Sequence, residues 1–162
     1  MAGHVSLKLL GGEILTGDAL LPQYTPNVGG ADVRLEWPLE RYRDTLERLA
    51  EGGYAMAWPG HREPIDEPME RVRAVVRYHE ERAYRVVSHL NDREEAMAWE
   101  VATALFGELQ GIHVLHGPGE AYAHLDHLSR EGTLERDSRR FRLRDRGYNR
   151  FAARRSRTWP LE

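Results

Sequence analysis

The stretch Glu13-Ile14-Leu15-Thr16-Gly17-Asp18 decides the fold, because it joins a short apolar run to a tight turn that carries a carboxylate. An earlier apolar run at residues 5–10 precedes it across Gly11-Gly12. This pattern predicts either a hairpin or two successive strands. Gly17 lets the backbone turn sharply after the second run. Asp18 is therefore expected at a strand exit, where a side chain is held more rigidly than on a loop tip.

A second predicted strand exit carries a histidine. The apolar run Tyr54-Ala55-Met56-Ala57-Trp58 follows two glycines and is broken by Pro59-Gly60, so that His61 lies at the break. Each signal is weak alone, because an aspartate after glycine is more often a turn residue and a histidine after a strand is more often merely exposed. Together, Asp18 and His61 supply two residue types that bind metal ions, and both are candidate metal ligands.

The order of motifs along most of the chain carries a family resemblance. The motifs are Gly3-His4-Val5-Ser6-Leu7, Leu15-Thr16-Gly17-Asp18-Ala19-Leu20-Leu21-Pro22, Pro38-Leu39-Glu40, Trp58-Pro59-Gly60-His61 and Pro64-Ile65. In this order they resemble the second half of the metallo-β-lactamase superfamily, whose members are metal-dependent hydrolases. The resemblance implies that Asp18 bridges two metal ions, usually zinc, and that His61 binds one of them as a terminal ligand.

The same comparison shows what the chain lacks. The family's other ligands come from a His-x-His-x-Asp-His motif in the earlier half of the fold and from a histidine that precedes a Gly-His pair such as Gly3-His4. The chain starts too late to contain them, and His4 resembles the second, non-ligand histidine of that pair. A zinc site needs about three or four protein donors. We therefore expect a truncated hydrolase that binds zinc weakly or not at all and is inactive alone.

One later segment imitates the missing motif. His124-Leu125-Asp126-His127 has the His-x-Asp-His spacing, and Tyr122 stands where the leading histidine belongs. Residues 120–130 are predicted to form a helix, however, whereas the family's motif lies on a loop after a strand. His124 and His127 can share one helix face. The favoured interpretation is two partly exposed helix histidines rather than a second metal site.

Composition limits the class of protein. The chain has 162 residues, of which 41% are hydrophobic and 30% charged, with a net charge of −3 and no cysteine. Any metal site must therefore use histidine, carboxylates or water. No apolar run approaches the roughly 20 residues that cross a bilayer, and no basic start followed by an apolar core marks a signal peptide. These features predict a cytoplasmic protein with no membrane partner.

The predicted fold class is α+β. Helices are expected at residues 38–49, 67–90, 94–106 and 120–130, with a connection at 111–119 and a hairpin at 134–143 whose turn is Asp137-Ser138. His79 and His89, on the long helix, are interpreted as structural or exposed. The domain hypothesis is a partial αββα metallo-β-lactamase sandwich at 1–66, a linking helix at 67–92, a small winged-helix-like domain at 93–145, and a basic tail at 146–162.

The sequence supports two alternative functions, one catalytic and one limited to binding. In the first, the chain is the C-terminal part of a metal-dependent hydrolase of an ester, thioester, lactone or phosphodiester bond, which needs its missing N-terminal half or a second copy of itself. In the second, it is a non-catalytic module that binds RNA, DNA or protein. The second rests on the winged-helix resemblance and on nine arginines from Arg139 to Arg157, which form a candidate phosphate contact or a solvated tail. Glu40, Glu63 and Asp66 have no assignable role.

Overall fold

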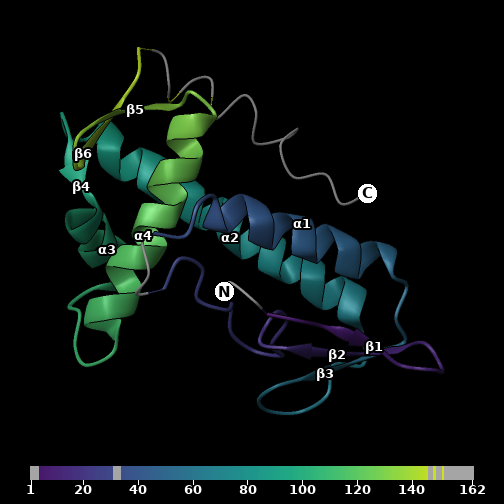
Figure 1. Cartoon of the computed structure of the whole chain (residues 1–162). Coiled ribbons are helices and arrows are strands. Elements are labelled where there is room, and N and C mark those ends of the chain that lie inside the picture. The colour runs from purple at the N-terminus through teal and green to yellow at the C-terminus, as the bar shows by residue number, and fades with distance from the viewer. Residues whose placement is uncertain (1–3, 31–33, 146–147, 149–150, 152–162) are drawn as a thin grey trace. The chain divides into compact units, whose positions relative to one another are not determined.

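The structure, a computed structural model, describes residues 4–30, 34–145, 148 and 151 (Figure 1). The chain divides into two compact units. Among the described residues, unit 1 consists of 4–26 and 40–79, and unit 2 of 27–30, 34–39, 80–145, 148 and 151. Most of the basic tail expected at 146–162 lies outside the described residues.

Unit 1 is built on a three-stranded sheet of order β1-β2-β3. Strand β1 (Leu7–Lys8) pairs antiparallel with β2 (Glu13–Gly17), and β3 (Met56–Pro59) pairs parallel with β2 (Figure 1). The antiparallel pairing decides between the two sequence alternatives in favour of a hairpin across Gly11-Gly12. Both glycines have positive φ, which the hairpin turn requires.

Helix α1 (Pro38–Glu51) makes the crossover between the parallel strands β2 and β3. Parallel neighbours need such a connection because a short turn cannot reverse the chain twice. Pro38 occupies the first turn, where its missing N–H costs nothing, and the helix extends two residues beyond the predicted 38–49. Leu46 and Leu49, one turn apart, are buried.

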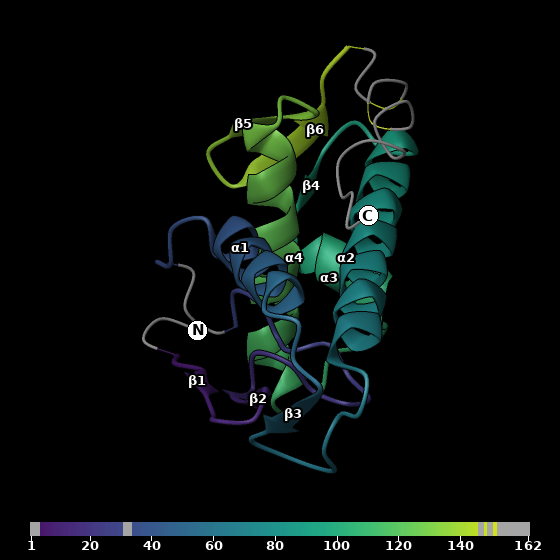
Figure 2. The same cartoon turned by 90° about the vertical axis from the view of Figure 1, so that its right-hand side faces the viewer.

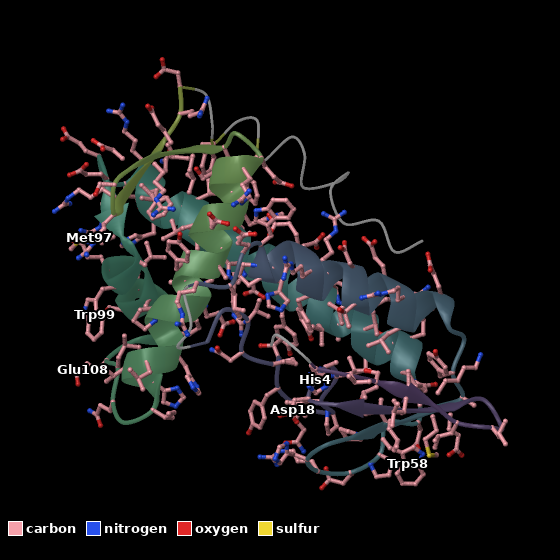
Figure 3. All side chains as sticks on the ribbon, in the orientation of Figure 1. His4, Asp18, Trp58, Met97, Trp99 and Glu108 are labelled. Carbon is pink, nitrogen blue, oxygen red and sulfur yellow. The ribbon has the colours of Figure 1, made fainter. Side chains whose placement is uncertain are left out.

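The two faces of this sheet differ in exposure. Ile14, Thr16 and Ala57 are buried, whereas Leu7, Leu15 and Trp58 are 56%, 40% and 37% exposed. Leu7 pairs with Leu15, and Leu15 pairs with Trp58, so the three exposed side chains form one row across the strands. Figure 3 shows Trp58 on the side of the sheet away from the helices. Unit 1 thus leaves one apolar sheet face uncovered by the described residues.

Helix α2 (Pro68–Asn91) confirms the long helix expected at 67–90 and contributes to both units. Val72 and Val75 are buried in its first half, and Val86 and Val87 in its second. His79 is fully buried, and its ring meets that of Tyr42 edge to face with centroids 5.5 Å apart. His89 is partly buried, and desolvation lowers its pKa. His79 is therefore packed in the protein interior, and His89 is partly removed from solvent.

Unit 2 contains three strands and two further helices. These are β4 (Ala96–Met97), α3 (Ala98–Phe106), α4 (His113–Arg130), β5 (Leu134–Asp137) and β6 (Arg140–Leu143). The sheet has the order β4-β6-β5 with antiparallel pairs. Figure 2 shows the β5–β6 hairpin at the C-terminal end of α4. The predicted hairpin is confirmed, and Ser138 in its turn has positive φ.

The helix predicted at 94–106 is wrong in its first turn. Ala96 and Met97 are extended and pair with Phe141 and Arg140, and the helix begins only at Ala98. The carboxylate of Glu100 accepts a hydrogen bond from the N–H of Met97 at 2.7 Å, which caps the helix there. The strand depends on a partner more than 40 residues away, which local periodicity cannot reveal.

Helix α4 also begins earlier than predicted. It starts at His113 rather than at 120 and contains Pro118, although Gly117-Pro118-Gly119 looked like a connection. Gly119 serves a close approach instead, since a Cβ there would lie 1.5 Å from the carbonyl oxygen of Gly30. Glycine is required where two backbones meet at this distance.

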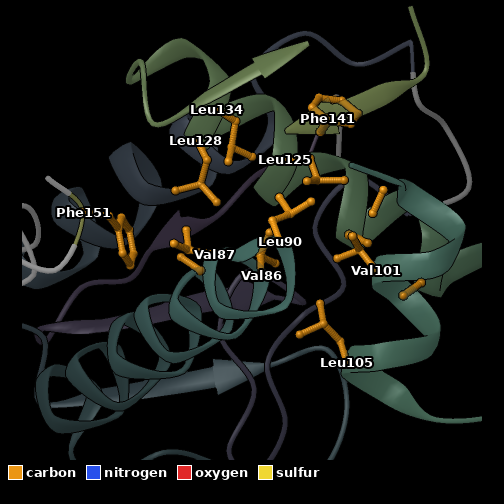
Figure 4. Close-up of a cluster of buried hydrophobic side chains, with 14 residues drawn as sticks. Val86, Val87, Leu90, Val101, Leu105, Leu125, Leu128, Leu134, Phe141 and Phe151 are labelled. Carbon is orange, nitrogen blue, oxygen red and sulfur yellow. The ribbon is translucent and has the colours of Figure 1, made fainter. Parts of the chain in front are cut away.

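The core of unit 2 gathers side chains from helices and hairpin (Figure 4). Its largest fully buried members include Leu90, Leu125, Leu128, Leu134 and Phe141. Phe151 also packs into it.

Among the described residues, no helix combines the length and apolar character needed to cross a membrane.

Candidate metal site

The carboxyl ends of β2 and β3 place the two predicted ligands together. Gly17 is paired with Pro59, and the N–H of Gly60 donates to the carbonyl of Gly17 at 2.9 Å. Because the strands run parallel, the residues that follow them emerge at the same edge. There the Nδ1 of His61 lies 2.7 Å from Oδ1 of Asp18, a hydrogen bond in which the ring nitrogen donates.

This pair faces solution. The side chain of His61 is 73% exposed and that of Asp18 33% exposed. Its energetic contribution is therefore small, because both side chains are exposed to solvent. The hydrogen bond occupies Nδ1 and leaves Nε2 of His61 as the second ring nitrogen, the atom through which an oriented histidine commonly binds a metal.

Two glycines let the turns approach each other. Gly17 has φ +52°, a left-handed conformation that glycine adopts without steric cost. A Cβ on Gly60 would lie 2.9 Å from Oδ1 of Asp18 and 3.4 Å from Cα of Gly17. The contact between the turns therefore depends on the absence of a side chain at position 60.

His4 contacts the backbone of the Asp18 turn. Its Nε2 lies 2.8 Å from the carbonyl oxygen of Thr16, to which it donates. The ring also lies against Gly17, because a Cβ there would be 2.5 Å from Cε1 of His4. Figure 3 shows His4 and Asp18 close together. The non-ligand role that the resemblance implies for His4 stays a prediction.

Arg71 is a residue that the sequence did not single out. Its guanidinium donates from Nε to the carbonyl of Leu21 at 2.5 Å and from Nη2 to that of Tyr24 at 2.9 Å, which ties the segment after Asp18 to helix α2. Burial lowers the pKa of Arg71. Nothing in the sequence distinguishes it from the other arginines of this helix, because its carbonyl partners are irregular backbone.

The donor types fit a metal such as zinc, but the number of donors does not. Carboxylate oxygen and imidazole nitrogen are both zinc ligands. Within residues 4–30, 34–145, 148 and 151, no group of three or more histidine, aspartate, glutamate or cysteine side chains is arranged to hold a metal ion. Glu40, Glu63 and Asp66 therefore add no third donor to Asp18 and His61 in such a group. These two residues alone do not constitute a metal centre.

The His124–His127 segment is buried, so the expected partial exposure was wrong. His124 is 0% and His127 3% exposed. His124 donates from Nδ1 to the carbonyl of Glu120 at 3.0 Å, and burial lowers its pKa to about 4. Asp126 accepts a hydrogen bond from Nε of Arg130 at 2.8 Å. Helix α4 is enclosed by unit 2 on more than one side, which a single amphipathic stripe did not predict.

A buried polar cluster lies beside His124. Arg82 and Glu120 form an ion pair at 2.5 Å, with side chains only 19% and 8% exposed, and the amide of Asn27 donates to Glu120 at 2.9 Å. Burial raises the pKa of Glu120, opposed by the neighbouring charge of Arg82. The amide of Asn27 also donates to the carbonyl of His116 at 3.3 Å, so this cluster joins residue 27 to α4.

The arginines of the hairpin are exposed but partly paired. Arg140 lies 3.1 Å from Glu95, and Arg142 lies 3.1 Å from Glu135. Arg144 donates to the carbonyl of Leu134 at 3.2 Å. These contacts reduce the positive charge that the β5–β6 hairpin presents to a phosphate backbone.

Comparisons with known proteins give two similar solved structures. One is a metallo-β-lactamase family protein from Thermus thermophilus, with a TM-score of 0.71 and 31% identity over 82% of this chain and 42% of that one. The other is a β-lactamase domain protein from Burkholderia ambifaria, with a TM-score of 0.74 and 25% identity over the same shares. The chain thus spans less than half the length of either. No family model and no curated protein matches the sequence.

Proposed function

We propose that this chain, which belongs to the metallo-β-lactamase superfamily, contributes Asp18 and His61 to the metal centre of a hydrolase. The reaction class is hydrolysis of an ester, thioester, lactone or phosphodiester bond, with zinc as the metal. In the complete centre, Asp18 would bridge two ions and His61 would bind one of them. Metal ions in such a centre supply an activated water and polarise the bond that is cleaved.

The observation that supports this proposal is the 2.7 Å contact between Asp18 and His61. Residues 43 positions apart meet at adjacent strand ends, on a sheet edge open to solution. Parallel pairing of β2 and β3 brings these two strand ends together, and both side chains placed there are of metal-ligand type. The similarity to the two solved proteins extends over 82% of the chain and supports membership of this superfamily.

The remaining donors must come from outside the described residues. With two donors, zinc affinity should be weak, because water competes for the open coordination positions. We propose that a polypeptide segment outside this sequence or a second copy of the chain supplies them. The chain alone should therefore have no hydrolase activity.

The genome provides the first check. In-frame codons just upstream of Met1 that encode a His-x-His-x-Asp-His motif would support the hydrolase. An upstream region without the motif would refute the N-terminal-half source and leave self-association as the route to a complete site.

The second check is direct metal binding. The purified chain is titrated with Zn²⁺ in a calorimeter, beside Asp18→Asn and His61→Ala. We expect weak binding that is lost in both variants, while Glu63→Ala, an exposed change near His61, binds as the original does. Stoichiometric tight binding, or binding that survives loss of His61, would contradict this assignment of donors.

A second candidate function is nucleic-acid binding by unit 2. Its favouring observations are the order helix, strand, helix, helix and hairpin, with the strand paired to the hairpin as β4-β6-β5, and the exposed arginines of the hairpin. This order resembles that of a winged helix. The test is a mobility shift with labelled single-stranded RNA or DNA, compared with the double variant Arg140→Gln and Arg142→Gln. Salt-dependent binding that is lost in this variant supports the role, and no binding at low salt rules it out.

A further inference from the structure

We propose that Thr16 and His4 are positioning residues that hold the Asp18 turn against the strand end carrying His61. This inference rests on the proposed metal-binding role of Asp18 and His61. The contacts that support it are hydrogen bonds to main-chain carbonyls near Asp18 and His61, and all of them lie within unit 1.

The carbonyl of Thr16 closes the turn that contains Asp18. It accepts a hydrogen bond from the N–H of Ala19 at 3.0 Å, so residues 16–19 form a turn with Asp18 as its third residue. His4 donates to the same oxygen at 2.8 Å. A carbonyl oxygen has two lone pairs, and here each has a donor. The two donors, Ala19 and His4, fix the direction of this carbonyl. The direction of the carbonyl in turn fixes the position at which Asp18 follows strand β2.

The side chain of Thr16 connects the turn to the neighbouring strand. It is fully buried, and its hydroxyl lies 3.3 Å from the carbonyl of Trp58 in β3 and 3.3 Å from that of Leu20. One hydroxyl carries one proton, which these two acceptors share with the carbonyl of Gly17 at 3.5 Å. The Trp58 carbonyl lies three residues before His61. Thr16 therefore links the chain on both sides of Asp18 to the strand that delivers His61.

The ring of His4 restricts the turn sterically as well. It occupies the space that a side chain at Gly17 would fill, with Nε2 2.6 Å and Cε1 2.5 Å from the position of a Cβ there. Donation to a carbonyl also fixes the neutral ring as the Nε2–H tautomer. Around a metal site, groups that hydrogen-bond to the ligands hold the ligands in their orientation. His4 and the Thr16 hydroxyl have the same effect here, but they bond to main-chain carbonyls rather than to the ligand side chains.

Four variants of the full chain separate these contributions. Thr16→Val keeps the shape and removes the hydroxyl, whereas Thr16→Ser keeps the hydroxyl. His4→Phe keeps a ring and removes the donor, whereas His4→Gln keeps an N–H donor. The conservative member of each pair should retain the wild-type behaviour if hydrogen bonding, rather than packing, is what matters.

The first readout is independent of metal. Amide hydrogen exchange is measured at Ala19 and Gly60, whose N–H groups bond to the turn, with Val87 in unit 2 as an internal reference. Thr16→Val and His4→Phe should accelerate exchange at Ala19 and Gly60 but not at Val87, and long-range nitrogen correlations should show the Nε2–H tautomer of His4. Unchanged exchange at both turn amides in both variants would overturn the proposal.

The second readout is the visible spectrum of added Co²⁺, which reports its ligands. Thr16→Val and His4→Phe should weaken Co²⁺ binding by about tenfold, with recovery in Thr16→Ser and His4→Gln. Accelerated exchange with unchanged Co²⁺ binding would also overturn the positioning role. If the original chain does not bind Co²⁺ through Asp18 and His61 at all, the metal-binding proposal fails, whereas the holding of the turn is decided by the exchange measurement alone.

Discussion

The N–H of Gly60 donates to the carbonyl of Gly17 at 2.9 Å, and this bond joins the two turns that carry Asp18 and His61. It continues the parallel pairing of β2 and β3 by one step past the end of the strands. The candidate site is therefore an extension of sheet geometry rather than a feature of mobile loops.

Replacing Gly60 with alanine should separate the candidate ligands without unfolding the chain. The new Cβ would lie 2.9 Å from Oδ1 of Asp18, whose carboxylate is exposed enough to swing away. The free energy of unfolding should change by less than about 1 kcal/mol, because φ at Gly60 is not positive. Urea unfolding measures this, and Zn²⁺ affinity should fall. Glu63→Ala is the control, and unchanged Zn²⁺ affinity in Gly60→Ala would contradict the prediction.

The uncovered sheet face should make the chain associate. Leu7, Leu15 and Trp58 form an exposed apolar row, and such a row favours contact with another surface. Leu15→Lys should shift sedimentation velocity profiles toward the monomer with little effect on stability, since Leu15 is 40% exposed. Trp99→Gln, an exposed change in unit 2, should have no such effect. Equal association of the original chain and Leu15→Lys would place the contact elsewhere.

The stability of the chain should fall as the pH is lowered from about 6.5 to about 4. His124 has its pKa lowered from 6.5 to about 4 by burial, so the unfolded state binds more protons in this range. The stabilising effect of a neutral His124 is complete above about pH 6.5 and lost at pH 4. A shift of this size corresponds to about 3 kcal/mol.

Urea unfolding at several pH values tests this for the original chain and for His124→Gln. The variant should be less stable at pH 7 and should lose less stability on acidification. His113→Gln, which removes an exposed histidine of the same helix, should keep the original pH dependence. A His124→Gln profile parallel to the original would show that another group causes the acid sensitivity.

Removing the charge of Arg82 should be costly because it leaves Glu120 in a buried site. Arg82→Met is expected to lower the free energy of unfolding by about 3 kcal/mol. Adding Glu120→Leu should recover part of this loss, since no uncompensated carboxylate then remains buried. The matched control is Arg77→Met, whose pair with Glu70 is exposed on both sides, with an expected change below about 1 kcal/mol. Equal losses in both single variants would contradict the argument.

Sequence reasoning found the two candidate ligands because their signals are local. Glycine and proline mark both strand exits, and the structure brings these exits together at the edge of one sheet. The same reasoning missed Arg71 and gave Thr16 no role. Their hydrogen-bond partners are main-chain carbonyls of irregular segments. Every residue type has such a carbonyl, so the sequence does not predict which one will accept a hydrogen bond.

The errors in unit 2 have a common cause. Local pattern predicts a helix at 94–97 and a connection at 113–119. Strand β4 exists, however, through its pairing with β6, and the early turns of α4 tolerate glycine because Gly119 packs on Gly30. The burial of His124 and His127 likewise depends on neighbours distant in sequence. Propensity and periodicity describe a segment by itself, whereas these features belong to pairs of segments.

The sequence by itself showed a resemblance to the metallo-β-lactamase superfamily. It also predicted the order of the elements of unit 1 and the two side chains at its strand exits, because turn chemistry and apolar runs are properties of neighbouring residues. Only the tertiary structure decided that β1 and β2 form a hairpin, that Leu7, Leu15 and Trp58 share an open face, and that Asp18 meets His61 within hydrogen-bonding distance. Those facts depend on strand register and on which face the helices cover. Register and coverage are set by contacts between segments far apart along the chain.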